Sequence, residues 1–170
     1  IPRERADDVI YFNPVDTERP MGLNILEADT EEEKDLVALD AMNMMVKMFG
    51  EEIFGPRIQD YFRNGCLTLM SDEDEGGSIT DLVKLFTDDE WQKYKVSKVN
   101  NPIVKSFWEK QMAQTGQREK QEMIPYFAAK FGQFYTNSLI RNIVGQTKSA
   151  FDVSDCMDNG KILLMNLSKG

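Results

Sequence analysis

Histidine is absent from this chain of 170 residues. Its absence excludes a Ser-His-Asp triad, a Cys-His nucleophile pair and any zinc site with a histidine ligand. The two cysteines, Cys66 and Cys156, are too few and too far apart for a disulfide framework or a cysteine-only zinc site. We therefore expect two reduced thiols, as in a cytoplasmic protein.

Long apolar runs and an excess of positive charge are also missing. No uncharged stretch approaches the roughly 18 residues that a membrane-spanning helix requires, and no apolar segment follows residues 1–5 as it does in a signal peptide. The net charge is −9, whereas nucleic-acid binders usually present a basic surface to phosphates. The composition fits one globular domain and favours protein partners over direct contact with nucleic acid.

Apolar segments typical of strands lie near both ends of the chain. One covers residues 7–14 and runs into an Asn13-Pro14 turn, and the other covers residues 161–166 after an Asp158-Asn159-Gly160 turn. Two strands alone make a marginal sheet. We therefore predict that both belong to a larger parallel sheet and that the residues between them are an insertion.

The residues between the strands have the apolar spacing of helices. We predict a mainly α fold, a bundle of six to eight helices with the two short strands at its base. The predicted helices cover residues 31–49, 56–70, 80–86, a helix capped by Thr87, residues 102–116, 118–136 and 138–144, with one more turn from Ser154 or Asp155.

Several local signals support these helices. Thr30 and Glu33 form a capping box, and Gly50 is placed to end the first helix in a left-handed cap. Since that helix is apolar on more than one face, we interpret it as the central helix of the bundle. Pro125 predicts a kink or break near residues 121–125. The ten methionines fit an adaptable core, with a methionine-lined binding groove as the alternative.

The segment closest to a phosphate-binding loop is residues 142–149, Asn-Ile-Val-Gly-Gln-Thr-Lys-Ser. A phosphate loop requires glycine where this segment has Asn142 and Thr147, and it follows a strand rather than a helix. The last strand also ends in Met165-Asn166, without the acidic residue that holds Mg²⁺. We therefore expect this segment to be a linker that leaves the helical part, and we expect no ATP binding or hydrolysis by this chain.

Three other clusters have a plain structural explanation beside a functional one. The acidic run Asp72–Glu75 lacks the spacing of a calcium loop and is better explained as a solvated loop. Asp88 and Glu90 suit the first turn of a helix better than acid–base catalysis. A basic cluster interleaved with aromatic residues resembles a single-strand binding surface, but its aromatic residues follow helical spacing and favour core packing. This cluster contains Lys93, Lys95, Lys98, Lys105, Lys110, Arg118 and Lys120, with Trp91, Tyr94, Phe107 and Trp108.

The two ends resemble a known family. The segment from Asp7 to Leu26, and the segment from Arg141 through Gly145-Gln146 and Phe151-Asp152 to Gly170, are similar to the conjugative coupling ATPases of type IV secretion, the TraG/TraD-like members of the HerA/FtsK group. The resemblance covers roughly a third of the chain and is diffuse in the helical middle. It implies a RecA-like motor domain that carries residues 30–145 as an inserted all-α domain, with residues 1–29 and 146–170 as its flanks.

The resemblance also implies a function. The parent would be a hexameric, ATP-driven DNA pump at the inner face of the cytoplasmic membrane, with ATP and Mg²⁺ bound outside this chain. The insertion would recruit a relaxase, relaxase-bound DNA or a secreted protein. No residue of the family's nucleotide-binding motifs falls on this sequence, so we assign no catalytic, cofactor-binding or metal-binding residue and expect no enzyme activity. A free-standing acidic helical adaptor that binds another protein is the alternative.

Overall fold

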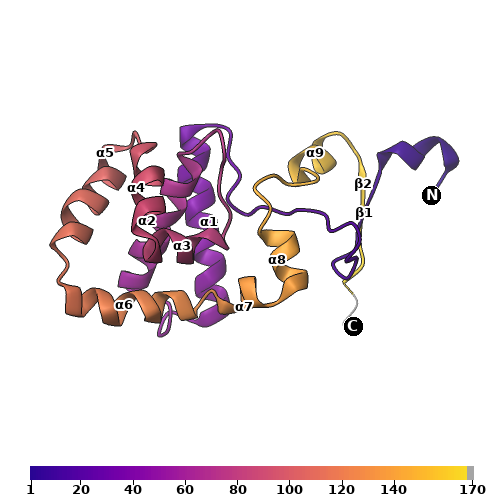
Figure 1. The fold of residues 1–170 in the computed structure, drawn as a ribbon. Coiled ribbons are helices and arrows are strands. Elements are labelled where there is room, and N and C mark those ends of the chain that lie inside the picture. The colour runs from indigo at the N-terminus through magenta and orange to yellow at the C-terminus, as the bar shows by residue number, and fades with distance from the viewer. Residues whose placement is uncertain (168–170) are drawn as a thin grey trace.

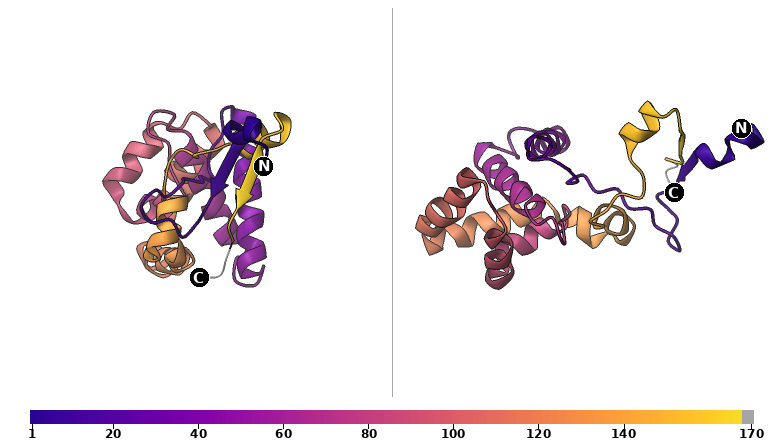
Figure 2. Two further views of the ribbon diagram at one scale, coloured as in Figure 1. Left: turned by 90° about the vertical axis from the view of Figure 1, so that its right-hand side faces the viewer. Right: turned by 90° about the horizontal axis from the view of Figure 1, so that it is seen from above.

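The computed structural model describes residues 1–167, so the last three residues of the predicted 146–170 flank lie outside it. A helical bundle forms one end of an elongated molecule, and a pair of strands forms the other (Figures 1 and 2). The mainly helical fold with two short strands is confirmed.

The bundle contains α1 (Glu31–Phe49), α2 (Pro56–Met70), α3 (Asp81–Thr87), α4 (Asp89–Ser97), α5 (Pro102–Ser106), the π-helix η2 (Phe107–Met112), α6 (Gln117–Ala129) and α7 (Gly132–Thr136). Outside it lie α8 (Ser138–Val144), α9 (Val153–Asp158), the 3₁₀-helix η1 (Arg3–Asp8), β1 (Val9–Phe12) and β2 (Ile162–Met165).

The two strands pair in parallel, as predicted. Val9 lies opposite Ile162 and Phe12 lies opposite Met165. Side chains alternate between the two faces of a strand. On one face Phe12 is buried and packs edge-on against Phe151, with ring centroids 5.6 Å apart. On the other face the paired residues Tyr11 and Leu164 are 55% and 41% exposed. Parallel sheets are normally covered on both faces, so this pair has the composition of a buried sheet but only one covered face.

Helix α1 begins and ends close to the predicted positions. The Thr30 hydroxyl accepts a hydrogen bond from the Glu33 amide, and the Glu33 carboxylate accepts one from the Thr30 amide, so the capping box is complete. The helix ends at Gly50, whose φ is 82° and ψ is 150°. This is a conformation that essentially only glycine adopts, and it differs from the left-handed helical cap that we expected.

The prediction that α1 is the central helix is wrong. Helix α1 buries one stripe, made of Lys34, Ala38, Ala41 and Met45. The central helix is α2, which buries nine of its fifteen residues and contacts α1, α3, α4 and α5. The number of apolar residues in α1 is misleading, because Leu36 and Leu39 of that helix face solvent.

Three local predictions also differ from the structure. The cap of α4 is Asp88 rather than Thr87, because the Asp88 carboxylate accepts the Trp91 amide. Tyr94 is 40% exposed and does not face inward. Helix α6 continues through Pro125 without the predicted break, and the helix expected over residues 118–136 is instead interrupted between Ala129 and Gly132, where α7 begins.

The buried apolar side chains of the described residues form two hydrophobic clusters. The larger one fills the bundle with aromatic side chains, among them Tyr61 stacked on Phe86 with ring centroids 5.6 Å apart. The smaller one contains Phe12, Ile143, Phe151 and Cys156 beneath the strand pair. Helix α8 joins the clusters, because Val144 packs against both.

Gly65 tests the packing of α3 on α2. A Cβ atom at this position would lie 2.7 Å from Leu82 Cδ2 and 3.2 Å from Phe86 Cε2. We expect Gly65→Ala to lower the free energy of unfolding by about 1–3 kcal/mol because it overfills the core. The control is Gly132→Ala in α7, where a Cβ meets nothing within 4 Å and the change should be neutral or stabilising. Urea unfolding measures both; a Gly65→Ala protein as stable as the parent would contradict this packing.

Candidate functional site

The segment with the nearest likeness to a phosphate loop lies between the bundle and the strand pair. It starts in α8, and its polar groups contact the protein itself. The Ser149 amide donates to Glu27 Oε2 at 2.9 Å, and Lys148 Nζ lies 3.5 Å from Glu27 Oε1. Both contacts attach residues 148 and 149 to Glu27, which lies in the segment that leads from the strand pair into the bundle, as expected for a linker.

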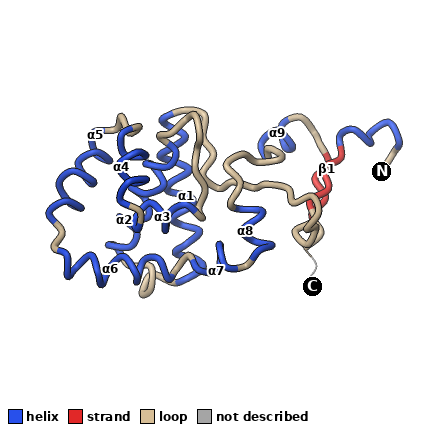
Figure 3. The backbone as a smooth tube through the Cα atoms, viewed as in Figure 1, coloured by secondary structure: helices blue, strands red, loops and turns tan. Residues whose placement is uncertain are grey.

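We call the place where these two chain segments meet the junction. It consists of the outgoing segment (residues 20–27) and the returning segment (residues 143–150), which connect the strand pair to the bundle (Figure 3). Two backbone hydrogen bonds join them, from the Leu23 amide to the Ile143 carbonyl at 3.0 Å and from the Ala150 amide to the Gly22 carbonyl at 2.9 Å. The approach at Gly22 is close, since a Cβ there would lie 2.6 Å from the Lys148 carbonyl oxygen.

Asn24 is the central residue of the junction, and it is only 7% exposed. Its amide group donates hydrogen bonds to the carbonyl oxygens of Thr147 and Gly77, both at 3.0 Å. Its backbone amide donates to Ser149 Oγ, and its side-chain oxygen accepts the Leu26 amide. Asn24 therefore ties the outgoing segment to the returning segment and to the bundle at the same time.

The bundle reaches the junction through its acidic loop (residues 72–77). Lys95 of α4 is 1% exposed, and its Nζ lies 2.7 Å from Asp72 Oδ2, 3.1 Å from Glu75 Oε2 and 3.0 Å from the Gly76 carbonyl oxygen. Lys34 of α1 contacts Glu73 of the same loop at 3.2 Å. The expectation of a solvated loop is therefore wrong for Asp72, which is buried, since it forms an ion pair with Lys95.

Burial and pairing act against each other in this ion pair. Burial by itself raises the pKa of Asp72, but hydrogen bonds from Lys95 and from the Glu75 amide outweigh it and hold the pKa below its usual value. Burial alone lowers the pKa of Lys95, and its hydrogen bonds to Asp72 and Glu75 outweigh that and raise it. Both groups are charged at neutral pH, and the pair fixes the loop against α4.

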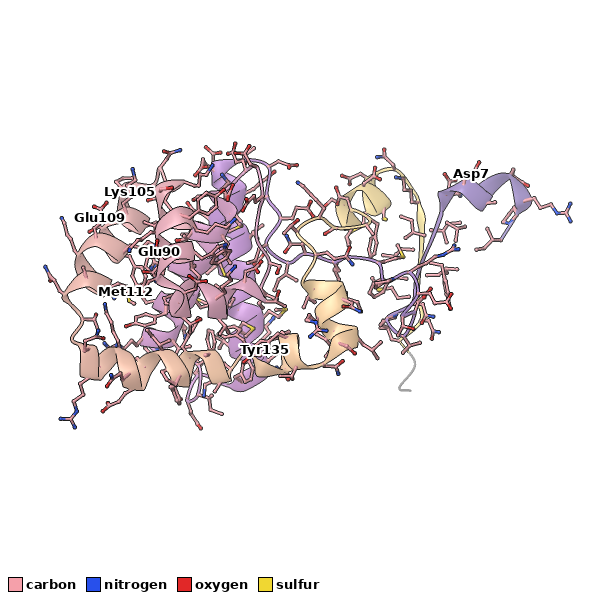
Figure 4. The ribbon with its side chains drawn as sticks, in the orientation of Figure 1. Asp7, Glu90, Lys105, Glu109, Met112 and Tyr135 are labelled. Carbon is pink, nitrogen blue, oxygen red and sulfur yellow. The ribbon has the colours of Figure 1, made fainter. Side chains whose placement is uncertain are left out.

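The remaining candidates do not gather into one site. Asp88 caps α4, and the Glu90 carboxylate accepts a hydrogen bond from Lys93 one turn further on. Glu90 and Lys105 lie in the half of the molecule away from the strand pair (Figure 4).

The basic cluster is likewise dispersed, and it does not form a surface for stacking bases. Lys95 is buried in its ion pair, and Phe107 and Trp108 are part of the bundle core. The indole of Trp108 donates to Thr68 Oγ1 at 2.8 Å. The prediction that these aromatic residues pack in the core is confirmed for Phe107 and Trp108.

Cys66 and Cys156 are free, as predicted. They are buried in different clusters, and burial raises the pKa of the Cys66 thiol. Among residues 1–167, His, Cys, Asp and Glu side chains nowhere form a group of three or more suited to hold a metal ion. Within the same residues, each helix is too short or too polar to cross a bilayer.

Sequence reasoning missed the roles of Asn24 at the junction and of Lys95 beneath the acidic loop. Lys95 lies one helical turn after Trp91, on the side of α4 that faces the acidic loop, and that spacing was the available signal. Asn24 stands in an irregular segment whose pattern gives no sign of its four hydrogen bonds.

The sequence was compared with models of protein families, with curated proteins and with solved structures, and none of the three comparisons gives a match.

Replacing Lys95 tests the ion pair. We expect Lys95→Met to cost about 3–5 kcal/mol of stability, because it leaves the Asp72 carboxylate buried without its cation. The matched control is Lys98→Met, which removes a partly exposed lysine 3.5 Å from Asp74 and should cost less than about 1 kcal/mol. Equal losses for the two variants in urea unfolding would contradict a structural role for the buried pair.

The same pair predicts a dependence on acid. Since the pKa of Asp72 is lower in the folded than in the unfolded chain, its contribution to stability is complete above the unfolded value of about 4 and decreases as the pH falls below it. An Asp72→Asn/Lys95→Met variant lacks this contribution. Its free energy of unfolding should therefore fall less steeply than that of the parent as the pH drops below about 4, and identical slopes would contradict the assignment.

Proposed function

We propose that this chain is the helical insertion domain of a conjugative, DNA-translocating coupling ATPase, together with short flanks of the motor domain. Its role in the proposal is to recruit a relaxase, relaxase-bound DNA or another secreted protein to the type IV secretion motor. ATP and Mg²⁺ would be bound by motor segments outside these residues, in a hexamer at the inner face of the cytoplasmic membrane.

The parallel strand pair supports the proposal most strongly. Two parallel strands cannot be joined by a tight turn, and here the connection between β1 and β2 is the entire bundle. The face that carries Tyr11 and Leu164 is apolar and open. A sheet with further strands and a covering helix would bury that face, which is what a motor domain around this insertion supplies.

The junction supports the same interpretation from the side of the bundle. The outgoing and returning segments lie together and share hydrogen bonds with the acidic loop. A domain joined in this way moves with the sheet rather than swinging on two independent linkers. Movement of the motor strands would therefore be transmitted to the whole bundle, as a recruiting domain on a translocating machine requires.

The alternative, a free-standing acidic adaptor, is favoured by the charge of the chain and by an exposed apolar face on α1. The two functions differ in what covers the open face of the strands. An adaptor without a motor has to bury Tyr11 and Leu164 against another molecule, and a second copy of the chain is the simplest one. Sedimentation of the chain at increasing concentration distinguishes the two functions. A dimer that forms in the parent chain and is lost in the Tyr11→Lys variant favours the adaptor.

Interference in living donor cells tests the recruiting role. The cells carry a conjugative element whose own coupling ATPase contains this segment, and they also produce the chain separately. If the chain binds cargo, we expect DNA transfer to fall as its level rises, because cargo is held away from the motor. Unchanged transfer at levels above those of the ATPase would contradict recruitment.

Mg-ATP should leave the unfolding temperature of the purified chain unchanged, and a saturable increase would contradict the non-catalytic assignment.

A further inference from the structure

Helix α1 leaves some of its apolar side chains exposed although its main neighbour is α2. Its buried stripe contains two alanines, one methionine and Lys34. Leu36 and Leu39, two of its largest apolar side chains, are 61% and 44% exposed. An amphipathic helix normally turns its large apolar residues toward the core. Val37, Met42, Met44, Val46 and Phe49 of α1 do pack against the core, so Leu36 and Leu39 are additional apolar residues outside its buried stripe. Helix α1 lies at the edge of the bundle (Figure 2).

The exposed leucines lie within a strongly acidic surface. Glu32, Asp35 and Asp40 are exposed on the same helix, within one turn of Leu36 or Leu39. The acidic loop does not belong to this surface, because Glu73 contacts Lys34 in the buried stripe of α1 and Asp72 is itself buried. Residues 27–40 alone hold seven carboxylates and one lysine, a net charge of −6 in a chain whose net charge is −9.

We infer that the outer face of α1, with Leu36 and Leu39 at its centre and Glu32, Asp35 and Asp40 at its rim, is the docking surface for a basic amphipathic helix of a partner protein. The apolar side chains of such a helix would cover the leucines, and its lysines or arginines would meet the acidic rim. Nucleic acid does not fit this surface, because its phosphates would be repelled. The inference names the surface used in the recruiting role and so rests on that proposal.

The probe is a synthetic helical peptide of lysine and leucine with all leucines on one face. The comparison peptide has the same composition with the leucines spread around the helix. We expect the amphipathic peptide to bind more tightly in fluorescence anisotropy, and its affinity to fall with added salt. Equal binding of the two peptides would overturn the inference, because it would leave only non-specific attraction of opposite charges.

The leucine variant separates apolar contact from charge. Leu36→Glu/Leu39→Glu adds two negative charges, so charge alone would strengthen binding of a basic peptide. We expect at least about a tenfold weaker affinity instead, since the apolar anchors are lost. The matched control, Ile103→Glu/Ile140→Glu, adds the same charge at exposed apolar positions on α5 and α8 and should not weaken binding. An unchanged affinity in the leucine variant, or an equal loss in the control, would contradict docking on α1.

The charge variant and the oligomeric state complete the test. Asp35→Asn/Asp40→Asn should weaken binding and make it less dependent on salt, and no effect on either would contradict the acidic rim.

Sedimentation of the chain alone identifies the other possible occupant: self-association abolished by Leu36→Glu/Leu39→Glu would assign this face to a second copy and overturn the inference. None of these measurements involves the strand pair, so a failure here is distinguishable from a failure of the insertion proposal.

Discussion

The parallel pairing of β1 with β2 is the constraint on which the rest of this structure depends. A parallel pair has to be linked by a connection that crosses from one end of the strands to the other, and here residues 13–161 form that connection. The chain leaves the carboxyl end of β1 and returns to the amino end of β2, at the opposite end of the strand pair. Between these two points, backbone hydrogen bonds hold residues 20–27 and 143–150 side by side.

The junction turns that proximity into a fixed attachment. Its hydrogen bonds connect the two chain segments, and Asn24 continues the network to Gly77 at the end of the acidic loop. From there the buried ion pair between Asp72 and Lys95 reaches α4. Buried polar networks of this kind specify one arrangement of their elements when every member has a partner. Among the described residues, each buried side-chain nitrogen and oxygen has a hydrogen-bond partner. The bundle is thus oriented relative to the strands by specific bonds.

Local patterns in the sequence predicted the elements well. The capping box of Thr30 and Glu33 and the helices predicted over residues 56–70 and 138–144 lie where the structure has them, because each rests on contacts within a few residues. The parallel pairing of the ends was also predicted. The choice of α1 as central helix failed, because periodicity measures how apolar a helix is but not which neighbour covers each face. Lys95 and Asn24 were missed for a related reason: their partners lie 23 and more than 50 residues away in sequence. The π-helix η2 had no local signal that we recognised.

The two chain ends are neighbouring strands of one sheet, and we propose that this sheet extends beyond these residues. Hydrogen exchange of the backbone amides, resolved by residue in the purified chain, tests it most directly. Amides of Val9–Phe12 and Ile162–Met165 should be protected, because they pair with each other, but they should exchange well before those of α2, because one face of the strand pair is open. Strand amides as slow as those of α2 in a monomer would show that the sheet is complete as it stands. Strand amides that exchange as fast as an unfolded chain would show that the ends do not pair, and either result would contradict the account.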